Sequence, residues 1–277
     1  MADIALQKTR AEAFRNMHRG RLLLLPNAWD VASARIIEES GFGAMATTSA
    51  GVAFTLGYPD GQRISRQEML AAVSRIAAAV QVPVTADVEA GYGNRPEDTA
   101  LTARAVIEAG AVGMNLEDAT GDAENPLLDL SLQIEKINAV IEEARRAGVP
   151  IVLNARTDVY LLQVGAPERR YELALKRLAA FRDAGADCLF VPGIRDSETI
   201  RHFVVDLRHP INILAGPGSP PIPELEKLGV ARVSLGSAPM RATLGLLRKM
   251  AEELKNSGTY RAMEGAPSHD DVNRMMG

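Results

Sequence analysis

Short apolar runs recur along the chain, and each is followed by a stretch with helical periodicity. The runs are almost wholly apolar rather than alternating, which is typical of parallel strands buried on both faces. We predict eight strands, at residues 22–25, 44–48, 84–86, 113–116, 151–155, 188–191, 211–215 and 232–235. Strands that alternate with helices imply right-handed crossovers and a parallel sheet. Eight such units in 277 residues favour a single α/β domain closed into a (β/α)8 TIM-type barrel over an open sheet.

The stretches between the runs carry the signals of amphipathic helices. Apolar residues such as Met69, Val73 and Ile76 fall on one helical face, and Ser65 with Glu68 makes a capping-box pattern. Glycines close several helical stretches, as Gly148 does, where a left-handed residue is favoured. No GxGxxG pattern follows the first run, which counts against a dinucleotide-binding sheet. We expect one domain over residues 1–277, with a short C-terminal helical tail from about residue 258.

Composition narrows the class of partner. Charged residues make up 24% of the chain and the formal net charge is −4, without a basic face, so a nucleic-acid partner is not expected. No apolar run approaches the ~18 residues that cross a bilayer, and the N-terminus lacks a signal-peptide block, so no membrane partner is expected. The one cysteine, Cys188, excludes an internal disulfide framework and favours the cytoplasm.

Acidic side chains gather at the ends of the third and fourth predicted strands. Asp87 and Glu89 are two apart and should point the same way, and Glu117 ends the next strand. In a barrel these strand ends meet at one mouth, where the three carboxylates repel one another unless a cation or a proton intervenes. Oxygen ligands suit Mg²⁺, with Mn²⁺ also possible. The alternative is a structural network in which the acids pair with Arg156 and neighbouring basic residues.

Two further segments carry candidate chemistry. Arg156 ends the fifth predicted strand, where its planar guanidinium could hold an anionic group of a ligand or form a salt bridge to Glu117 or Asp158. The small residues from position 47 to 52 have free amides that could cradle an oxyanion. Asp60 lies in a Tyr-Pro-Asp-Gly turn and could be functional or a plain surface residue.

Together these segments resemble the phosphoenolpyruvate mutase/isocitrate lyase superfamily. The resemblance spans roughly residues 23–247 and rests on 48–50, 56–60, 87–93, 116–118 and 155–158. It implies that Asp87 binds Mg²⁺, and that Glu89 and Glu117 act mostly through metal-bound water. It also implies that Thr48, Ser49 and Ala50 supply hydrogen-bond donors to an α-keto acid carboxylate. By the same resemblance, Asp60 lies beside the reacting centre and Arg156 contacts the substrate's anionic end.

Departures from the superfamily pattern bear on the reaction. Residues 119–127 lack the cysteine and histidine that lyases of the superfamily carry after the fourth strand, so cleavage of isocitrate by that route is not expected. In the same loop, only Asn125 could replace the polar residues of phosphonate-forming members. Glu89 stands where aspartate is commoner, which lengthens the side chain by one methylene.

Three hypotheses follow for the function. The first is a Mg²⁺-dependent lyase-type enzyme that breaks or forms a C–C or P–C bond in a small anionic α-keto acid through an enolate-like intermediate, with a substrate such as oxaloacetate, phosphonopyruvate or a related oxo-diacid. The second is a phosphoenolpyruvate phosphonomutase. The third is a metabolite-binding barrel without catalysis, suggested by the bare loop after the fourth strand.

The resemblance also implies a homodimer or homotetramer formed by exchange of the last barrel helix, here about residues 238–255. That segment holds an apolar stripe, Met240, Leu244, Leu247 and Met250, which could equally close its own barrel.

Overall fold

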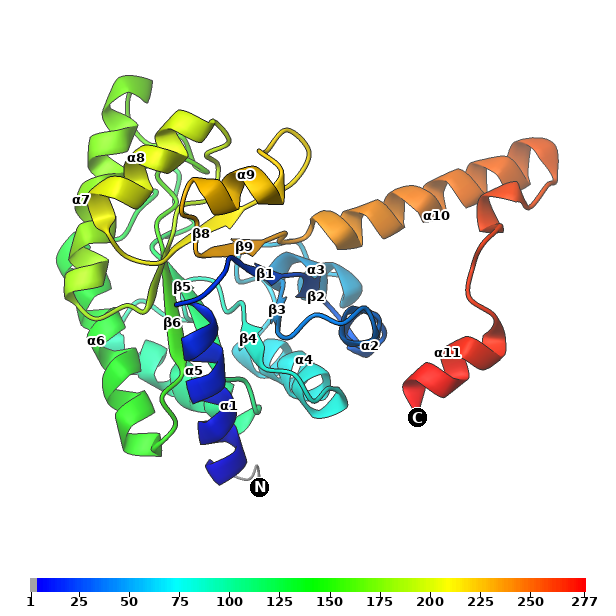
Figure 1. Cartoon of the computed structure of the whole chain (residues 1–277), viewed down its shortest axis with the longest axis horizontal. Helices are drawn as coiled ribbons and strands as arrows, with labels where there is room; N and C mark the ends of the chain where they lie inside the picture. The colour runs from blue at the N-terminus through cyan, green and yellow to red at the C-terminus, as the bar shows by residue number, and fades with distance from the viewer. Residues whose placement is uncertain (1–3) are drawn as a thin grey trace.

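A ring of parallel strands forms the centre of the protein (Figure 1). The computed structural model describes residues 4–277, so residues 1–3 of the expected domain lie outside the described part. The strands are β1 (Leu23–Leu25), β2 (Asn27–Ala28), β3 (Met45–Thr47), β4 (Val84–Ala86), β5 (Gly113–Glu117), β6 (Val152–Arg156), β7 (Cys188–Phe190), β8 (Ile211–Leu214) and β9 (Arg232–Ser234). Their order is β1-β9-β8-β7-β6-β5-β4-β3-β2, and every neighbouring pair is parallel.

The two edges of this sheet are consecutive pieces of chain. β1 and β2 are separated only by Pro26, which has no N–H to donate to a ladder. The sheet therefore closes on itself, and the predicted TIM-type barrel is confirmed. All eight predicted runs hold a strand, with ends that differ by at most one residue from the prediction.

Helices follow the strands, and those before α10 surround the barrel (Figure 1). They are α1 (Ile4–Met17), α2 (Val31–Glu39), α3 (Ser49–Thr55), α4 (Arg66–Ala79), α5 (Pro96–Glu108), α6 (Leu130–Ala147), α7 (Arg170–Asp183), α8 (Ser197–Leu207), α9 (Ile222–Lys227), α10 (Ala238–Ser257) and α11 (His269–Met276), with 3-10 turns at Pro167–Arg169 and Arg261–Met263. Ser65 and Glu68 form the predicted capping box of α4, and Gly148 is the left-handed cap of α6. The small-residue stretch after β3 is a helix, α3, rather than an open loop, and Thr48 caps it.

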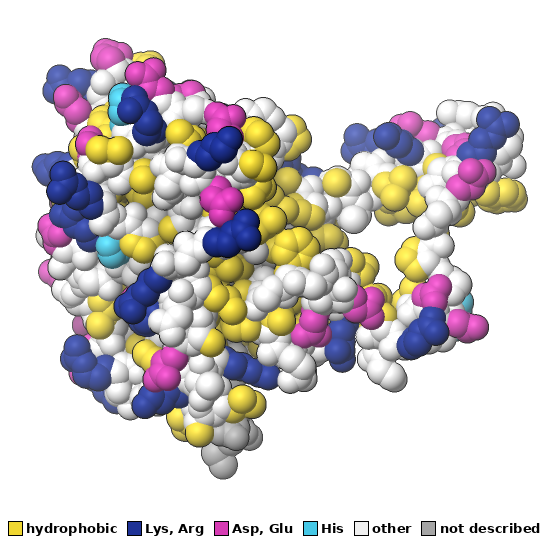
Figure 2. All heavy atoms as spheres, viewed as in Figure 1, with side chains coloured by type: hydrophobic (Ala, Val, Ile, Leu, Met, Phe, Trp, Pro, Cys, Tyr) yellow, Lys and Arg dark blue, Asp and Glu magenta, His cyan; other side chains and the backbone are white. Residues whose placement is uncertain are grey.

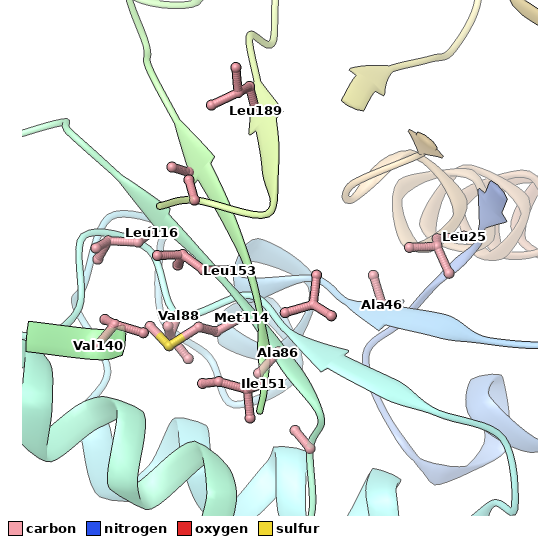
Figure 3. Close-up of a cluster of buried hydrophobic side chains, with 14 of the residues drawn as sticks. Leu25, Ala46, Ala86, Val88, Met114, Leu116, Val140, Ile151, Leu153 and Leu189 are labelled. Atoms are coloured by element: carbon pink, nitrogen blue, oxygen red, sulfur yellow. The ribbon is translucent and has the colours of Figure 1, made fainter. Parts of the chain in front are cut away.

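The core lies between the strands and the helices that surround them, and Figure 3 shows part of it around β4, β5 and β6. The N-terminal end of the barrel is closed by Phe14 of α1, which is fully buried. Gly113 makes room for this residue. A Cβ at position 113 would lie 2.8 Å from Thr85 Oγ1 and 3.0 Å from Phe14 Cε1. The opposite, C-terminal end of the barrel is the mouth, where functional residues of such barrels lie.

The last long helix leaves the barrel instead of packing on it. α10 projects away and the chain then returns through α11 toward α2 (Figure 1). Within α10 only Met240 is buried, while Leu244 and Leu247 are 45% and 60% exposed. Figure 2 shows apolar side chains along this projecting part. The apolar stripe of α10 thus does not close its own barrel. Within residues 4–277, no helix is both long and apolar enough to cross a membrane.

Candidate active site

The predicted acids and the arginine meet at the barrel mouth. Glu117 and Arg156 are the last residues of β5 and β6 and are paired in register. Asp87 and Glu89 follow β4, which ends at Ala86. The expectation that both acids sit on a strand is therefore wrong, because Glu89 has a φ of 52° in the left-handed region. This turn still keeps Glu89 close enough to Asp87 for their charges to interact.

Asp87 is held at both carboxylate oxygens. Ser49 donates its backbone N–H and its hydroxyl to Oδ2, at 2.9 and 2.8 Å. Asn115 on β5 donates its amide to Oδ1 at 3.2 Å, and Asn154 on β6 donates to Asn115 Oδ1 at 2.7 Å. These donors fix the direction of the Asp87 carboxylate. The polar residues Asn115 and Asn154 inside otherwise apolar runs were the sequence signal for this relay.

A buried cation lies within the barrel. Arg232 on β9 is fully buried, and within residues 4–277 none of its three guanidinium nitrogens has a hydrogen-bond partner. Burial lowers its pKa, while the charges of Cys188 and Asp87 act in the opposite direction. The positive charge of Arg232 and the carboxylate of Asp87 therefore attract each other through the low-dielectric interior. Sequence reasoning had treated Arg232 only as the start of a strand.

Arg156 is bound by two carboxylates. Its Nη1 lies 2.7 Å from Glu117 Oε2, and its Nε and Nη2 donate to the two oxygens of Asp158 at 2.5 and 2.9 Å. Its guanidinium carbon also lies 5.6 Å from the centroid of the Phe190 ring. Burial lowers the pKa of Arg156, but Glu117 and Asp158 outweigh that and raise it. The salt-bridge alternative is therefore present in the structure.

A second buried network supports the end of β6. Asp118, fully buried, accepts hydrogen bonds from the Asp158 backbone at 2.9 Å, the Thr157 hydroxyl at 2.7 Å and Arg177 Nε of α7 at 2.6 Å. Because Asp158 in turn holds Arg156, Asp118 positions the arginine without touching the mouth. No sequence pattern singles out Arg177, since its spacing only marks it as one residue of a helix.

The loop that carries Glu89 is anchored from outside the barrel. Lys136 of α6 is fully buried and donates to the carbonyl oxygens of Ala90 and Gly93, at 2.7 and 3.0 Å. The loop needs such support because Glu89 and Tyr92 both have left-handed backbone conformations. Burial lowers the pKa of Lys136 to about 8.

Glu89 is surrounded by other negatively charged side chains. Burial, and then the charges of Asp87 and Asp60, raise its pKa to about 7. The backbone N–H of Gln62 donates to its carboxylate. Asp60, exposed in the loop between α3 and α4 that also carries Gln62, has its own pKa raised by partial burial and by Asp87. Burial likewise raises the pKa of Glu117, against the effect of Arg156. Asp60, Asp87, Glu89 and Glu117 therefore share one electrostatic environment.

We predict that Glu89→Gln stabilises the metal-free protein at pH 8. A carboxyl whose folded pKa lies above its ordinary value of 4.5 stabilises the fold in acid, and this contribution is lost as the pH rises through about 7. The variant should gain roughly 2–3 kcal/mol over the parent at pH 8 and nothing at pH 4. Urea unfolding with EDTA measures this, with the exposed Glu135→Gln as control. Equal stability of variant and parent at pH 8 would show that burial and the neighbouring charges do not make the ionised Glu89 carboxylate unfavourable.

The mouth fits a hydrated divalent cation better than an all-protein metal cage. In the described residues, no three or more Asp, Glu, His or Cys side chains are arranged to hold a metal ion by themselves. Mg²⁺ commonly takes one or two carboxylates and keeps several waters. Asp87, oriented by Ser49 and Asn115, suits direct ligation, and Glu89 and Glu117 suit contact through water. The raised pKa of Glu89 marks negative charge that a cation would relieve.

The stretch expected to bind a keto-acid carboxylate lies beside Asp87. Both Ser49 donors are directed at Asp87, and the Thr48 hydroxyl accepts from Gly51 N at 3.3 Å. The amide of Ala50 is in the first turn of α3, where helix N–H groups have no partner within the helix. Of the three expected donors, the Ala50 amide is therefore the one best placed to reach a ligand.

The loop after β5 is closed on itself. Ala119 and Leu127 form an antiparallel bridge, and the Asn125 amide donates to Asp122 within the loop at 3.3 Å. Thr120 donates to the Asn125 carbonyl at 2.5 Å. The Asn125 side chain is thus hydrogen-bonded within an exposed turn. It does not take the place of the polar residues of phosphonate-forming relatives.

The barrel and the arrangement of its mouth define a lyase-type enzyme of the phosphoenolpyruvate mutase/isocitrate lyase superfamily, as the sequence predicted. Residues 14–255 match the family model described as phosphoenolpyruvate phosphomutase. Because this match covers most of the chain, the protein belongs to that family.

Three known proteins illustrate the likeness. The chain is 40% identical to a Burkholderia cenocepacia protein assigned provisionally as a lyase/mutase, whose crystal structure matches with a TM-score of 0.92 over 98% of this chain and 96% of that one. It is 36% identical to an uncharacterised protein of Mycobacterium tuberculosis, over 82% of each chain. It is 27% identical to an oxaloacetate decarboxylase of Rhodopseudomonas palustris, over 97% of this chain and 93% of the relative.

Proposed function

We propose that the protein is a Mg²⁺-dependent lyase that breaks or forms a C–C bond between C3, the carbon next to the keto group of a small 2-oxo acid, and a substituent of C3. The observation that carries the proposal is the meeting of four acids, Asp60, Asp87, Glu89 and Glu117, with Arg156 at one barrel mouth. The likeness to an oxaloacetate decarboxylase supports an oxo-diacid as the substrate. Mn²⁺ would satisfy the same oxygen donors.

Each residue has a distinct task in this proposal. Asp87 would bind the cation directly, and Glu89 and Glu117 would act through water bound to it. The bound cation would polarise the keto and carboxylate oxygens and stabilise the enolate that forms as the bond breaks. Arg156 orients the anionic group at the far end of the substrate.

The remaining tasks concern the substrate's near end and its protons. The Ala50 amide, with Thr48 and Ser49 beside it, lies where the carboxylate next to the keto group would bind. Asp60 has a raised pKa and lies on the exposed loop above Glu89, which suits it to move a proton to or from the reacting carbon.

A panel of 2-oxo acids tests the proposal. Oxaloacetate, 3-methyloxaloacetate and phosphonopyruvate are incubated with the enzyme in Mg²⁺, in EDTA, and in EDTA followed by excess Mg²⁺. We expect turnover of at least one oxo-diacid at about 1–10³ s⁻¹, lost in EDTA and restored by Mg²⁺. Thermal shifts without turnover for every compound would favour the metabolite-binding barrel instead.

The family model that matches this chain favours one second candidate, a phosphonomutase. That activity predicts interconversion of phosphonopyruvate and phosphoenolpyruvate, which phosphorus NMR records directly. The closed loop around Asn125 argues against it. A preparation that is active on an oxo-diacid and silent in the phosphorus spectrum would eliminate it.

We further propose that the protein is a homodimer or homotetramer in which α10 packs on a neighbouring barrel. α10 exposes Leu244, Leu246, Leu247 and Leu254 and covers no part of its own barrel beyond Met240. Apolar surface of this kind on a projecting helix marks an interaction site. Exchange of an identical element between subunits covers it at little cost.

Charge on this helix is predicted to separate the subunits. In the double variant Leu244→Glu and Leu247→Glu, burial of two carboxylates in an apolar interface is unfavourable, so the mass in solution should fall to that of one 29.7 kDa chain. Light scattering after gel filtration measures the mass. Val205→Glu, at a 55% exposed position on α8, is the control and should keep the assembly. Equal masses for the double variant and the parent would place the interface elsewhere.

A further inference from the structure

Gln62 joins two loops of the barrel mouth by a pair of hydrogen bonds. Its backbone N–H donates to the Glu89 carboxylate, and its side-chain Oε1 accepts from the backbone N–H of Tyr92 at 2.7 Å. The loop that contains Gln62 lies between α3 and α4 and also carries Asp60. The loop that contains Glu89 and Tyr92 lies between β4 and α5. One residue thus links the segments that carry two of the mouth acids.

The loop between β4 and α5 is the fixed partner in this link. Lys136 donates to the carbonyl oxygens of Ala90 and Gly93, at 2.7 and 3.0 Å. The Thr102 hydroxyl of α5 donates to the carbonyl oxygen of Gly91 at 2.7 Å. Because Lys136 and Thr102 are both fully buried, water does not compete for these contacts. This loop therefore gives rigid support to a segment that is hydrogen-bonded to it.

The segment 59–63, which contains Asp60, has few contacts of its own. In the described part of the chain, both hydrogen bonds that connect it to another loop or element involve Gln62. Asp60 and Arg63 are exposed, and the next buried side chain is that of Ile64. The place of Asp60 at the mouth therefore depends on Gln62.

Gln62 has a left-handed backbone conformation, with a φ of 56°. Residues other than glycine enter this region rarely and at a cost, because Cβ crowds the following carbonyl oxygen. Such a conformation persists where surrounding contacts hold it, and the two hydrogen bonds of Gln62 are contacts of this kind. Glycine would adopt the same backbone freely but would offer no acceptor to Tyr92. The glutamine side chain therefore serves the link between the loops rather than the shape of the turn.

We propose that Gln62 is a positioning residue that holds Asp60 beside C3 of the bound 2-oxo acid. This inference rests on the proposed function, in which Asp60 moves a proton to or from the reacting carbon. When a bond at C3 breaks, its electron pair stays on the 2-oxo acid as an enolate, and the other fragment leaves without it. The protonated Asp60 carboxyl then gives its proton to C3, and the carboxylate that remains regains a proton from water. This transfer requires a fixed distance between Asp60 and C3, which the link through Gln62 provides.

A double-mutant cycle separates positioning from a general loss of structure. Gln62→Met keeps the length of the side chain but removes the acceptor for Tyr92. We expect it to lower kcat on the oxo-diacid roughly tenfold and to change KM less than about threefold, because only the reacting geometry is disturbed. Asp60→Asn alone should lower kcat by at least about 10²-fold. In that background, Gln62→Met should lower kcat less than about twofold further, because Asp60 no longer has a proton to place.

A second glutamine supplies a matched control. Gln163 also has a left-handed backbone, with a φ of 54°, but it is exposed and its side chain has no hydrogen-bond partner in the described part of the chain. Gln163→Met should keep kcat within about twofold of the parent. Gln62→Gly removes the link but also relieves the left-handed backbone, so its urea midpoint should stay close to that of the parent. Its kcat should fall as in Gln62→Met, which a loss of folding would not explain.

Amide hydrogen exchange followed by mass spectrometry measures the link without turnover. Peptides that cover residues 56–65 should exchange at least about fivefold faster in Gln62→Met than in the parent, because the segment opens more often. The same peptides should exchange at the parent's rate in Gln163→Met.

The outcomes separate this inference from the proposed function. If exchange becomes faster in Gln62→Met while kcat stays at the parent's value, the link does not position Asp60 and the inference is wrong, although the proposed function stands. If exchange is unchanged, the link itself is absent and the inference is also wrong. An equal loss of kcat from Gln62→Met with and without Asp60→Asn would show that Gln62 acts on other groups. If the parent turns over no oxo-diacid, the proposed function fails, and this inference fails with it.

Discussion

Asp87→Ala is expected to abolish Mg²⁺ binding and to lower kcat/KM by at least about 10³-fold. Asp87 is the acid whose two oxygens are both oriented, by Ser49 on one side and Asn115 on the other. It also feels the buried charge of Arg232. Burial raises the pKa values of the remaining acids Glu89 and Glu117 even when Asp87 is absent, so a proton competes with the cation there. Calorimetry with Mg²⁺ and steady-state kinetics on the oxo-diacid measure the two effects.

The control for this variant lies at the other end of the barrel. Asp183 is exposed at the end of α7, on the side where strands begin, and contacts Arg182. Asp183→Ala should therefore keep both Mg²⁺ affinity and turnover. If Asp87→Ala behaves like this control in both assays, the metal centre is not at β4 and the enzymatic interpretation of the mouth fails.

Arg156→Met is expected to destabilise the metal-free protein by about 3–5 kcal/mol at neutral pH, the usual cost of leaving buried carboxylates unpaired. The substitution removes the partner of Glu117 and of Asp158, which are both largely buried. Arg156→Lys should recover part of the stability but not the turnover, because an ammonium group cannot reproduce the bidentate contact. Urea unfolding and kcat/KM give the two readouts.

An ion pair with a half-exposed arginine supplies the comparison. Arg104 pairs with Glu143 at 2.6 Å, but Arg104 is 48% exposed and Glu143 also contacts Arg146. Arg104→Met should cost less than about 1 kcal/mol, as surface pairs do. A loss for Arg156→Met no larger than for Arg104→Met would mean that water screens the mouth acids, and Arg156 would then have no structural role.

The sequence alone determined the barrel and the place of its chemistry. Buried parallel strands need unbroken apolar runs, and the crossovers between them need amphipathic helices with caps. Both can be recognised from local sequence patterns, such as the capping box of Ser65 and Glu68. Because barrel strands run parallel, residues at their C-terminal ends share one mouth. Asp87, Glu117 and Arg156 could therefore be grouped from their strand positions before any contact was known.

Only the tertiary structure decided how these residues are held and what surrounds them. Arg177 reaches Asp118, and Lys136 reaches Ala90, across more than forty positions of sequence, because the strand and helix that carry them pack together. The sequence also did not determine the direction of α10, since its apolar stripe could pack on its own barrel or on that of a neighbouring subunit. Local periodicity carries no information about such long-range contacts, which arise only when the chain folds back on itself.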